Sequence, residues 1–247
     1  MKIILVTSDI TYVPKNYNDV FEYVVRNSPH PIAGVVLIKI NKIAVLAKIP
    51  YLYFAGCKNI ANTLTYNIKD ALFNTRKGFL KKSGIPFFSA KSINDQKMIL
   101  WLQAMKPDLI VNMRARCIYN DAVLKIPRLG CANVHHGILP YQKGLFCDLY
   151  ALAENRATGF TIHQMTGNID RGKILYQEKV SGNKNYIGYL AEVASKEKTA
   201  IANFIQKTVR NNFLSEATTS HENQNVSMTT TPDFKKIKEF KRKGIIL

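Results

Sequence analysis

Three polar residues in this sequence have the types and spacing needed to move a proton and to stabilise a negative oxygen. Asn133 and His135 lie in the run 131–135, whose small and β-branched residues after a glycine predict a short buried strand. Because side chains alternate faces along a strand, the amide and the imidazole leave it on the same side. Asp170 follows in the string Gly-Asn-Ile-Asp-Arg-Gly. An amide donor, a base that titrates near neutral pH and a carboxylate together suit chemistry through a tetrahedral centre whose oxygen becomes negative.

Alternating strands and helices are expected to position these residues. Apolar runs predict buried strands, and apolar residues at helical spacing predict the helices between them. We expect an α/β fold with a Rossmann-like open, mostly parallel twisted sheet and a small C-terminal extension. The predicted strands are 3–7, 34–38, 85–88, 109–112, 131–135, 159–164 and 174–180, and the helices are 19–25, 98–105, 122–127, 146–153 and 190–210. In such a sheet ligands bind at the carboxyl ends of the strands, where Asn133 and His135 stand.

The predicted domain organisation has a catalytic domain over residues 1–180 and a C-terminal helix and basic tail over 181–247. An inserted basic and apolar segment, about 41–83, interrupts the first part. It is either a pair of amphipathic helices that touches a membrane surface or an acidic partner, or a pair that packs on the sheet with solvated lysines. The tail 232–247 has one apolar helical face, which either docks on the domain or leaves the lysines to meet phosphates or a membrane.

Composition is that of a soluble globular protein, with 247 residues, 47% hydrophobic residues and a net charge of +18. Such a charge attracts phosphates, anionic cofactors, nucleic acid or acidic lipid, although a generally lysine-rich proteome explains it equally well. The four cysteines show no CxxC spacing, which favours reduced thiols in a cytoplasmic protein over disulfides or a metal site. Met1 leads directly into a strand, so no signal peptide is expected, and lysines interrupt the apolar stretch 32–55, which argues against a membrane-spanning helix. The first loop lacks the glycines of a dinucleotide site.

The residues around the site also carry a family resemblance. The sequence resembles the formyltransferases that use 10-formyltetrahydrofolate. The motifs that carry the resemblance are Asn-x-His in 127–135, Leu139-Pro140, Lys143-Gly144, the string 158–165 and Asp-x-Gly in 169–175. The resemblance extends over about residues 3–180. It implies that Asn133, His135 and Asp170 are the catalytic residues, and that no metal is required. Asn133 and a protonated His135 would donate to the nascent oxyanion, and His135 would take the proton of the attacking amine.

The same resemblance implies binding residues. Those for 10-formyltetrahydrofolate are the turn Arg114, Ala115, Arg116, Cys117 and Ile118, together with Leu139 and the loop Met165, Thr166, Gly167, Asn168 and Ile169. Arg114 or Arg116 is expected at the cofactor's glutamate tail unless both are solvated. Those for the substrate are Gly137, Lys143 and Gly144. The rival of His135 is His136, which faces away from Asn133, and the strand pattern around His163 predicts a structural histidine.

Some positions depart from the family pattern. Gly137 stands where many relatives carry serine, Lys143 stands where arginine is usual, and the turn 113–117 is unlike the aromatic-glycine turn of the tRNA enzymes. The first loop also lacks the glycine-rich phosphate grip of the purine-pathway enzymes. A sequence ending at Leu247 leaves no room for the C-terminal barrel that grips initiator tRNA, so that acceptor is disfavoured.

The predicted function is therefore an N-formyltransferase that acts on a small-molecule amine, an amino sugar on a nucleotide. The inserted segment and the basic tail resemble those of formyltransferase-like proteins of surface-glycan synthesis. The alternatives are a 10-formyltetrahydrofolate hydrolase, a tRNA-directed formyltransferase, and a non-catalytic protein of the same fold that binds nucleic acid or a membrane.

Overall fold

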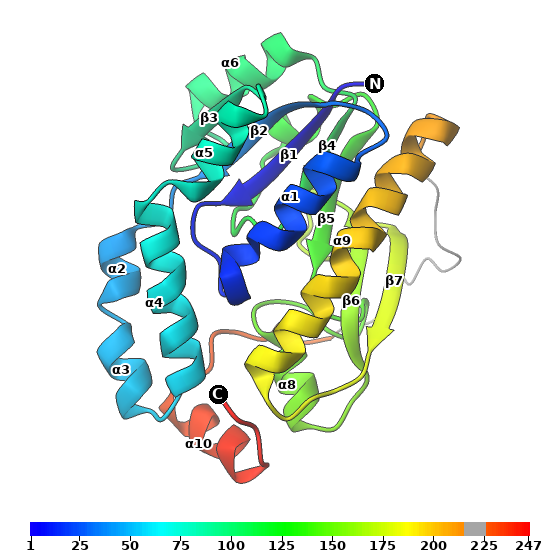
Figure 1. Ribbon diagram of the computed structural model, residues 1–247. Coiled ribbons are helices and arrows are strands. Elements are labelled where there is room, and N and C mark those ends of the chain that lie inside the picture. The colour runs from blue at the N-terminus through cyan, green and yellow to red at the C-terminus, as the bar shows by residue number, and fades with distance from the viewer. Residues whose placement is uncertain (215–225) are drawn as a thin grey trace.

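A seven-stranded open sheet forms the centre of the computed structural model, which describes residues 1–214 and 226–247 (Figure 1). The strand order is β3-β2-β1-β4-β5-β6-β7. The first five strands in the chain run parallel, and β6 and β7 are each antiparallel to the preceding strand. The strands are β1 (Ile3–Ser8), β2 (Ile32–Ile38), β3 (Phe87–Ala90), β4 (Leu109–Asn112), β5 (Gly130–His135), β6 (Thr158–Gln164) and β7 (Ile174–Val180). The predicted mostly parallel α/β sheet is confirmed.

Helices cover both faces of the sheet because its parallel strands are apolar on both sides. In β1, Ile3 and Leu5 pack with α1 and α9, whereas Ile4 and Val6 pack with α6 on the other face. The helical elements are η1 (Pro14–Tyr17), α1 (Asn18–Asn27), α2 (Lys42–Leu46), α3 (Ile49–Phe54), α4 (Lys58–Leu72), α5 (Thr75–Lys82), α6 (Gln96–Met105), α7 (Asp121–Leu124), α8 (Cys147–Ala153), α9 (Tyr186–Asn211) and α10 (Phe234–Arg242).

Several predicted elements differ from the observed ones in their bounds, and two of the differences have a local cause. The third strand covers 87–90 rather than 85–88, because the chain first completes the turn after α5 with Gly84 at a φ of 65°. The segment 41–83 forms four helices, α2 to α5, instead of a pair, because Pro50 and Gly56 divide its first half and Asn74 adopts a left-handed conformation between α4 and α5.

The inserted helices are joined to the loop after β1 by buried polar contacts. The Asn67 side-chain amide donates to the carbonyls of Thr11 and Val13, each at 2.8 Å, and its oxygen accepts from the Asn16 backbone N–H at 2.8 Å. The guanidinium of Arg76 donates to the carbonyls of Ser8 and Asn16. Because unpaired buried polar groups are costly, these bonds define where α4 and α5 stand. Helices α2 and α4 therefore pack mainly on this loop, whereas Leu80 of α5 belongs to the core cluster of the sheet.

The C-terminal residues also contribute to the core. Ile201, Phe204 and Ile205 of α9 are buried against the sheet, and Ile237 and Phe240 of α10 are 4% and 1% exposed. The docking of the tail on the domain, one of the two expected alternatives, is therefore what the structure shows for the apolar face of α10. The sequence also predicts a polar segment over 215–231, of which residues 215–225 lie outside the described residues.

Candidate active site

The end of β5 brings together polar side chains from three strands. Asn112 of β4 stands beside Asn133 in the parallel register, and His163 of β6 stands opposite Asn133 in the antiparallel register. His135 lies two residues further along β5, and its ring centroid is 6.1 Å from that of His163. The sheet register thus places the amide of Asn133 between the amide of Asn112 and the imidazole of His163, with the imidazole of His135 beside that of His163.

Hydrogen bonds define the orientation of the Asn133 amide. Its Oδ1 accepts from Asn112 Nδ2 at 2.9 Å, so its Nδ2 is directed to His163 Nε2 at 3.1 Å. Asn112 is held in turn by Ala115, whose backbone N–H donates to Asn112 Oδ1 and whose carbonyl accepts from Asn112 Nδ2, each at 3.1 Å. Since an amide nitrogen carries two hydrogens, Asn133 keeps one donor for a ligand.

His163 is a neutral acceptor in this network. Its Nδ1 lies 2.9 Å from the carbonyl of Gln164, which only accepts, so this nitrogen carries the proton and Nε2 accepts from Asn133. Burial first, and then the neighbouring His135, lower the pKa of His163 to about 4 against the opposing effect of Asp170. The strand pattern predicts a structural histidine here. Its place in the site comes from the antiparallel pairing of β6 with β5, which sets His163 opposite Asn133.

His135 and Asp170 approach each other as predicted from the sequence. The His135 Nε2 is 2.7 Å from the carbonyl of Gln142, so Nε2 carries a proton, and Nδ1 faces Asp170 Oδ1 at 3.6 Å. Asp170 Oδ1 is also 3.6 Å from His163 Nε2. The His135 and Asp170 side chains are 8% and 9% exposed, so their mutual attraction is weakly screened. The arrangement leaves Nδ1 as the nitrogen that can take a proton beside a carboxylate.

Asp170 is positioned by its own loop and by the turn after β5. It has a φ of 51°, and its Oδ2 accepts from the Gly144 backbone N–H at 3.1 Å. Gly172 follows so close to the strand that an added Cβ would lie 1.7 Å from the carbonyl oxygen of Gln164. The Asp-x-Gly spacing therefore allows the loop to turn back against β6 with the carboxylate towards His135.

The residues predicted to bind the substrate lie in the turn after β5, where Gly144 contacts Asp170. Lys143 is 6% exposed, and the backbone of Gly144 has a φ of 91°. Thr229 lies across them, since its backbone N–H donates to the Lys143 carbonyl at 3.0 Å and its carbonyl accepts from the Leu145 N–H at 2.9 Å. Gly137 lies in the same turn, and a Cβ there would meet Cys147 Sγ at 2.7 Å and His135 Nε2 at 2.9 Å, which leaves little space for a side chain.

The turn and the loop predicted to hold a cofactor lie next to each other. Met165 donates its backbone N–H to Cys131 and packs in the same apolar cluster as Ala115 and Cys117. A Cβ on Gly167 would be 3.7 Å from the carboxylate of Asp121 on α7. Among the other residues predicted to bind the cofactor, Ile118 is 66% exposed, Ile169 is 46% exposed and Leu139 is buried. Thr166 and Asn168 hydrogen-bond to each other within the loop.

The two arginines of the turn have different surroundings. Arg114 has a φ of 64° and an internal partner, because its Nη1 lies 3.9 Å from Glu197 and its guanidinium stands over the ring of Tyr17. Arg114 thus has a partner inside the protein, whereas the sequence led us to expect Arg114 or Arg116 at the cofactor's glutamate tail. Arg116 is exposed, with its guanidinium 5.3 Å from the centroid of the Tyr12 ring, and remains the arginine open to an anion.

A second buried network adjoins the site behind His135. His136 Nε2 lies 2.6 Å from Glu197 Oε1, and its Nδ1 lies 3.5 Å from Asp148. Tyr17 donates its hydroxyl to Glu197 Oε2 at 2.6 Å. His136 therefore points away from Asn133, as expected. Through Glu197 it links the turn after β5 to α9 and to Tyr17, which follows β1.

The open α/β sheet and the Asn-His-Asp group at its strand ends agree with the formyltransferase class that the sequence predicts. Comparisons with known proteins point to the same class. Residues 55–202 match the family model described as Formyl transferase. The chain belongs to the formyl transferase family.

Individual relatives carry different names. The chain is 38% identical over 109 residues to the bifunctional polymyxin resistance protein ArnA of Wigglesworthia glossinidia brevipalpis, a match that covers 44% of this chain and 17% of that protein. It is 34% identical over 107 residues to the methionyl-tRNA formyltransferase of Thermotoga maritima, covering 42% of this chain and 34% of that enzyme. The chain thus matches about a third or less of the length of these curated relatives.

Among solved structures, a sugar N-formyltransferase from Shewanella sp FDAARGOS_354 has the same fold. The TM-score is 0.61 at 17% sequence identity, and the comparison covers 98% of this chain and 88% of that one. At this identity the likeness is evidence of the fold alone.

Proposed function

We propose that this protein transfers a formyl group from 10-formyltetrahydrofolate to the amine of a small acceptor, an amino sugar carried on a nucleotide. The observation that carries the proposal is the convergence of Asn133, His135 and Asp170 at one end of the sheet. Asp170 Oδ1 lies 3.6 Å from both His135 Nδ1 and His163 Nε2, and Asn133 Nδ2 lies 3.1 Å from His163 Nε2. Membership of the formyl transferase family supports the reaction class.

The chain's own residues can perform the two tasks that such a transfer needs. The free N–H of Asn133 can donate to the formyl oxygen as it gains negative charge, which typically stabilises a transition state by about 3 kcal/mol. His135 can accept the proton of the acceptor amine at Nδ1, because Nε2 is already protonated against Gln142. Asp170, 3.6 Å from Nδ1, would stabilise the resulting imidazolium.

The residues present fit 10-formyltetrahydrofolate as the formyl donor. When bound, the folate supplies a formyl group on an electron-withdrawing nitrogen. The turn 114–118 and the loop 165–169 would hold its ring system, because they lie adjacent and expose the apolar side chains of Ile118 and Ile169. Arg116, exposed beside Tyr12, would attract the negative glutamate tail.

The amino-sugar acceptor is supported by one comparison and by the charge. One of the solved structures that cover 98% of the chain is a sugar N-formyltransferase. A nucleotide-linked sugar carries phosphates, which the net charge of +18 would attract. A second candidate acceptor, aminoacyl-tRNA, is favoured by the relatives named methionyl-tRNA formyltransferase.

The test offers the purified protein 10-formyltetrahydrofolate with either 4-amino-sugar nucleotides or aminoacyl-tRNA. Tetrahydrofolate is followed by absorbance and the formylated product by mass spectrometry. We expect His135→Ala to lower the rate about a hundredfold or more, since removal of a general base usually costs that much. His30→Ala, at a partly exposed histidine outside the site, is the control and should leave the rate unchanged.

Each alternative has its own result in this assay. Formate released at a comparable rate without any amine would identify a hydrolase. Product from aminoacyl-tRNA but from no amino sugar would replace the acceptor. Full activity of His135→Ala would overturn the assignment of the site.

A further inference from the structure

Helices α2, α3 and α4 expose many large apolar side chains on one edge of the molecule. Ile43, Phe54 and Phe73 are 80%, 82% and 83% exposed. Further exposed members of this surface are Leu46, Tyr51, Tyr53, Tyr66 and Leu72. Figure 1 shows the three helices side by side at this edge, and α4 contacts both of the others. Single exposed apolar residues are common on proteins, whereas a cluster of this size marks an interaction surface.

Most of these side chains do not take part in the internal packing of the helices. The inner sides of α2 and α4 supply Val45, Leu64 and Ile68, which pack with Ile10 after β1. Asn67 adds the buried hydrogen bonds to the same loop. The helices are therefore anchored from within, and the outer apolar side chains contact mainly water in the isolated chain. We call this outer surface, with the lysines around it, the apolar-basic face.

The charge on the apolar-basic face is predominantly positive. The only acidic residue in 41–83 is Asp70, whose carboxylate already accepts from the side chains of Asn16 and Asn18. The basic residues of the same segment are Lys42, Lys48, Lys58, Lys69, Arg76, Lys77, Lys81 and Lys82. Arg76 is buried, and Lys42 pairs with Asp9, but Lys48, Lys58 and Lys69 are exposed.

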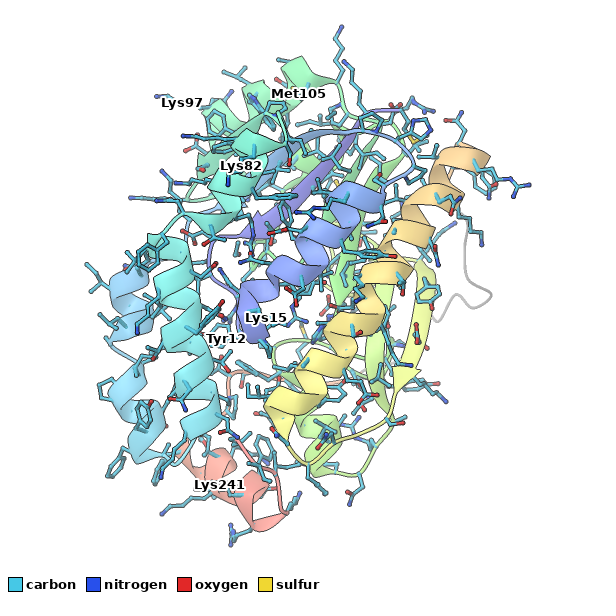
Figure 2. All side chains as sticks on the ribbon, viewed as in Figure 1. Tyr12, Lys15, Lys82, Lys97, Met105 and Lys241 are labelled. Atoms are coloured by element: carbon cyan, nitrogen blue, oxygen red, sulfur yellow. The ribbon has the colours of Figure 1, made fainter. Side chains whose placement is uncertain are left out.

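Helix α10 extends this face. The ring of Phe234 stacks on that of Phe54 with centroids 5.9 Å apart, and the Asn59 backbone N–H donates to the carbonyl of Leu247. Exposed Lys235, Lys238 and Lys241 thus stand next to the exposed aromatic residues of α3. Figure 2 shows Lys241 on α10, at the opposite end of the molecule from Lys97 on α6.

We propose that the apolar-basic face docks the protein on a membrane surface that carries anionic lipids. Aromatic and aliphatic side chains of such a face enter the boundary between headgroups and acyl chains, while lysines meet the lipid phosphates. No helix among the described residues is long and apolar enough to span a bilayer, so the association is peripheral. A second copy of this chain is a poorer occupant, because its identical face would bring like charges together.

The experiment measures sedimentation of the full chain with vesicles. Vesicles of phosphatidylcholine and phosphatidylglycerol in a roughly two-to-one ratio are compared with vesicles of phosphatidylcholine alone. We expect binding to the anionic vesicles only, and weaker binding as salt is raised, because salt screens the charges. Equal binding to both kinds of vesicle, or none to either, would overturn the proposal.

Two sets of variants locate the contact. The triple variant Ile43→Ser, Phe54→Ser, Phe73→Ser should bind anionic vesicles about a hundredfold more weakly, since each side chain loses apolar burial. The control Leu100→Ser, Phe213→Ser changes side chains that are 55% and 56% exposed outside this face, and it should bind like the wild type. Circular dichroism and thermal melting confirm that every variant is folded.

The second set separates this face from the general basicity of the chain. Lys48→Glu with Lys58→Glu should weaken binding about thirtyfold or more, at roughly one kcal/mol for each lysine near an anionic surface. Lys91→Glu with Lys97→Glu makes the same change in net charge at exposed positions elsewhere and should have little effect. Equal losses from both pairs would overturn the proposal.

The oligomeric state tests the competing occupant. Light scattering after size exclusion should give the same mass for the wild type and the triple serine variant. A dimeric wild type that becomes monomeric in the variant would show that a second copy covers the face, and would overturn the lipid proposal.

Discussion

Glu197 on α9 connects three parts of the molecule behind the candidate active site, and its replacement by glutamine should be strongly destabilising. The side chain is fully buried, and its oxygens lie 2.6 Å from His136 Nε2, 2.6 Å from the Tyr17 hydroxyl and 3.9 Å from Arg114. Burial alone raises the pKa of Glu197, but His136 and Arg114 outweigh it and hold the pKa below its usual value. The carboxylate is therefore charged in the folded protein at neutral pH.

Glu197→Gln keeps the volume and removes the charge, which leaves Arg114 and the ring of His136 without the carboxylate that they face. Loss of one member of a buried ion pair costs about 3–5 kcal/mol. For a chain of this size that corresponds to a fall in melting temperature on the order of 6 to 20 °C. Urea unfolding at pH 7 measures the free energy, and Glu192→Gln, at an exposed residue of the same helix, is the matched control. A Glu197→Gln variant within about 1 kcal/mol of that control would refute the reasoning.

The dependence on pH gives a second, independent measurement. A carboxylate whose folded pKa is depressed contributes stability above its unfolded pKa, which is near 4.5, and loses it as the pH falls through the folded value. The difference in unfolding free energy between the wild type and Glu197→Gln should therefore shrink below about pH 4.5. A difference that grows on acidification would contradict a charged Glu197. In a double-mutant cycle with Tyr17→Phe, the two effects should not add, because both changes act on one hydrogen bond.

Three further predictions concern packing and reactivity. Gly172→Ala should destabilise the protein, because the new Cβ would lie 1.7 Å from a backbone oxygen. In the control Gly78→Ala in α5, the new Cβ meets no atom within 4 Å, and the change should stabilise the protein by up to about 1 kcal/mol. Thermal melting compares the two variants. Phe240→Ala should cost about 3–5 kcal/mol in urea unfolding, since its ring is 1% exposed, and Phe213→Ala, at 56% exposure, should cost little; equal losses would show that α10 does not dock. Burial raises the pKa of Cys131 to about 12, so the native thiol should resist alkylation at pH 8 and react after unfolding, as peptide mass spectrometry can show.

Much of the architecture follows from local patterns. Apolar runs and, for β6 and β7, alternating patterns predict all seven strands, with the third displaced by two residues. The period of two along β5 places Asn133 and His135 on one side. The pattern of α9 is also visible in the sequence, and the structure begins it at Tyr186 with Asn185 as its cap. These features depend on neighbours within one element, so the order of residues is sufficient to predict them.

The contacts between elements are decided by the tertiary structure. His163 becomes a partner of Asn133 only because β6 pairs antiparallel with β5 in that register, and Arg114 turns to Glu197 across a separation that no motif marks. The segment 41–83 likewise looks like surface helices in sequence, whereas Asn67 and Arg76 tie it to the loop after β1. By itself, the sequence determines the alternation of strands and helices and the residue types at their ends, because these are local properties. Which charges become buried partners, and which apolar side chains stay exposed, depends on how the elements pack, and that is a property of the folded chain alone.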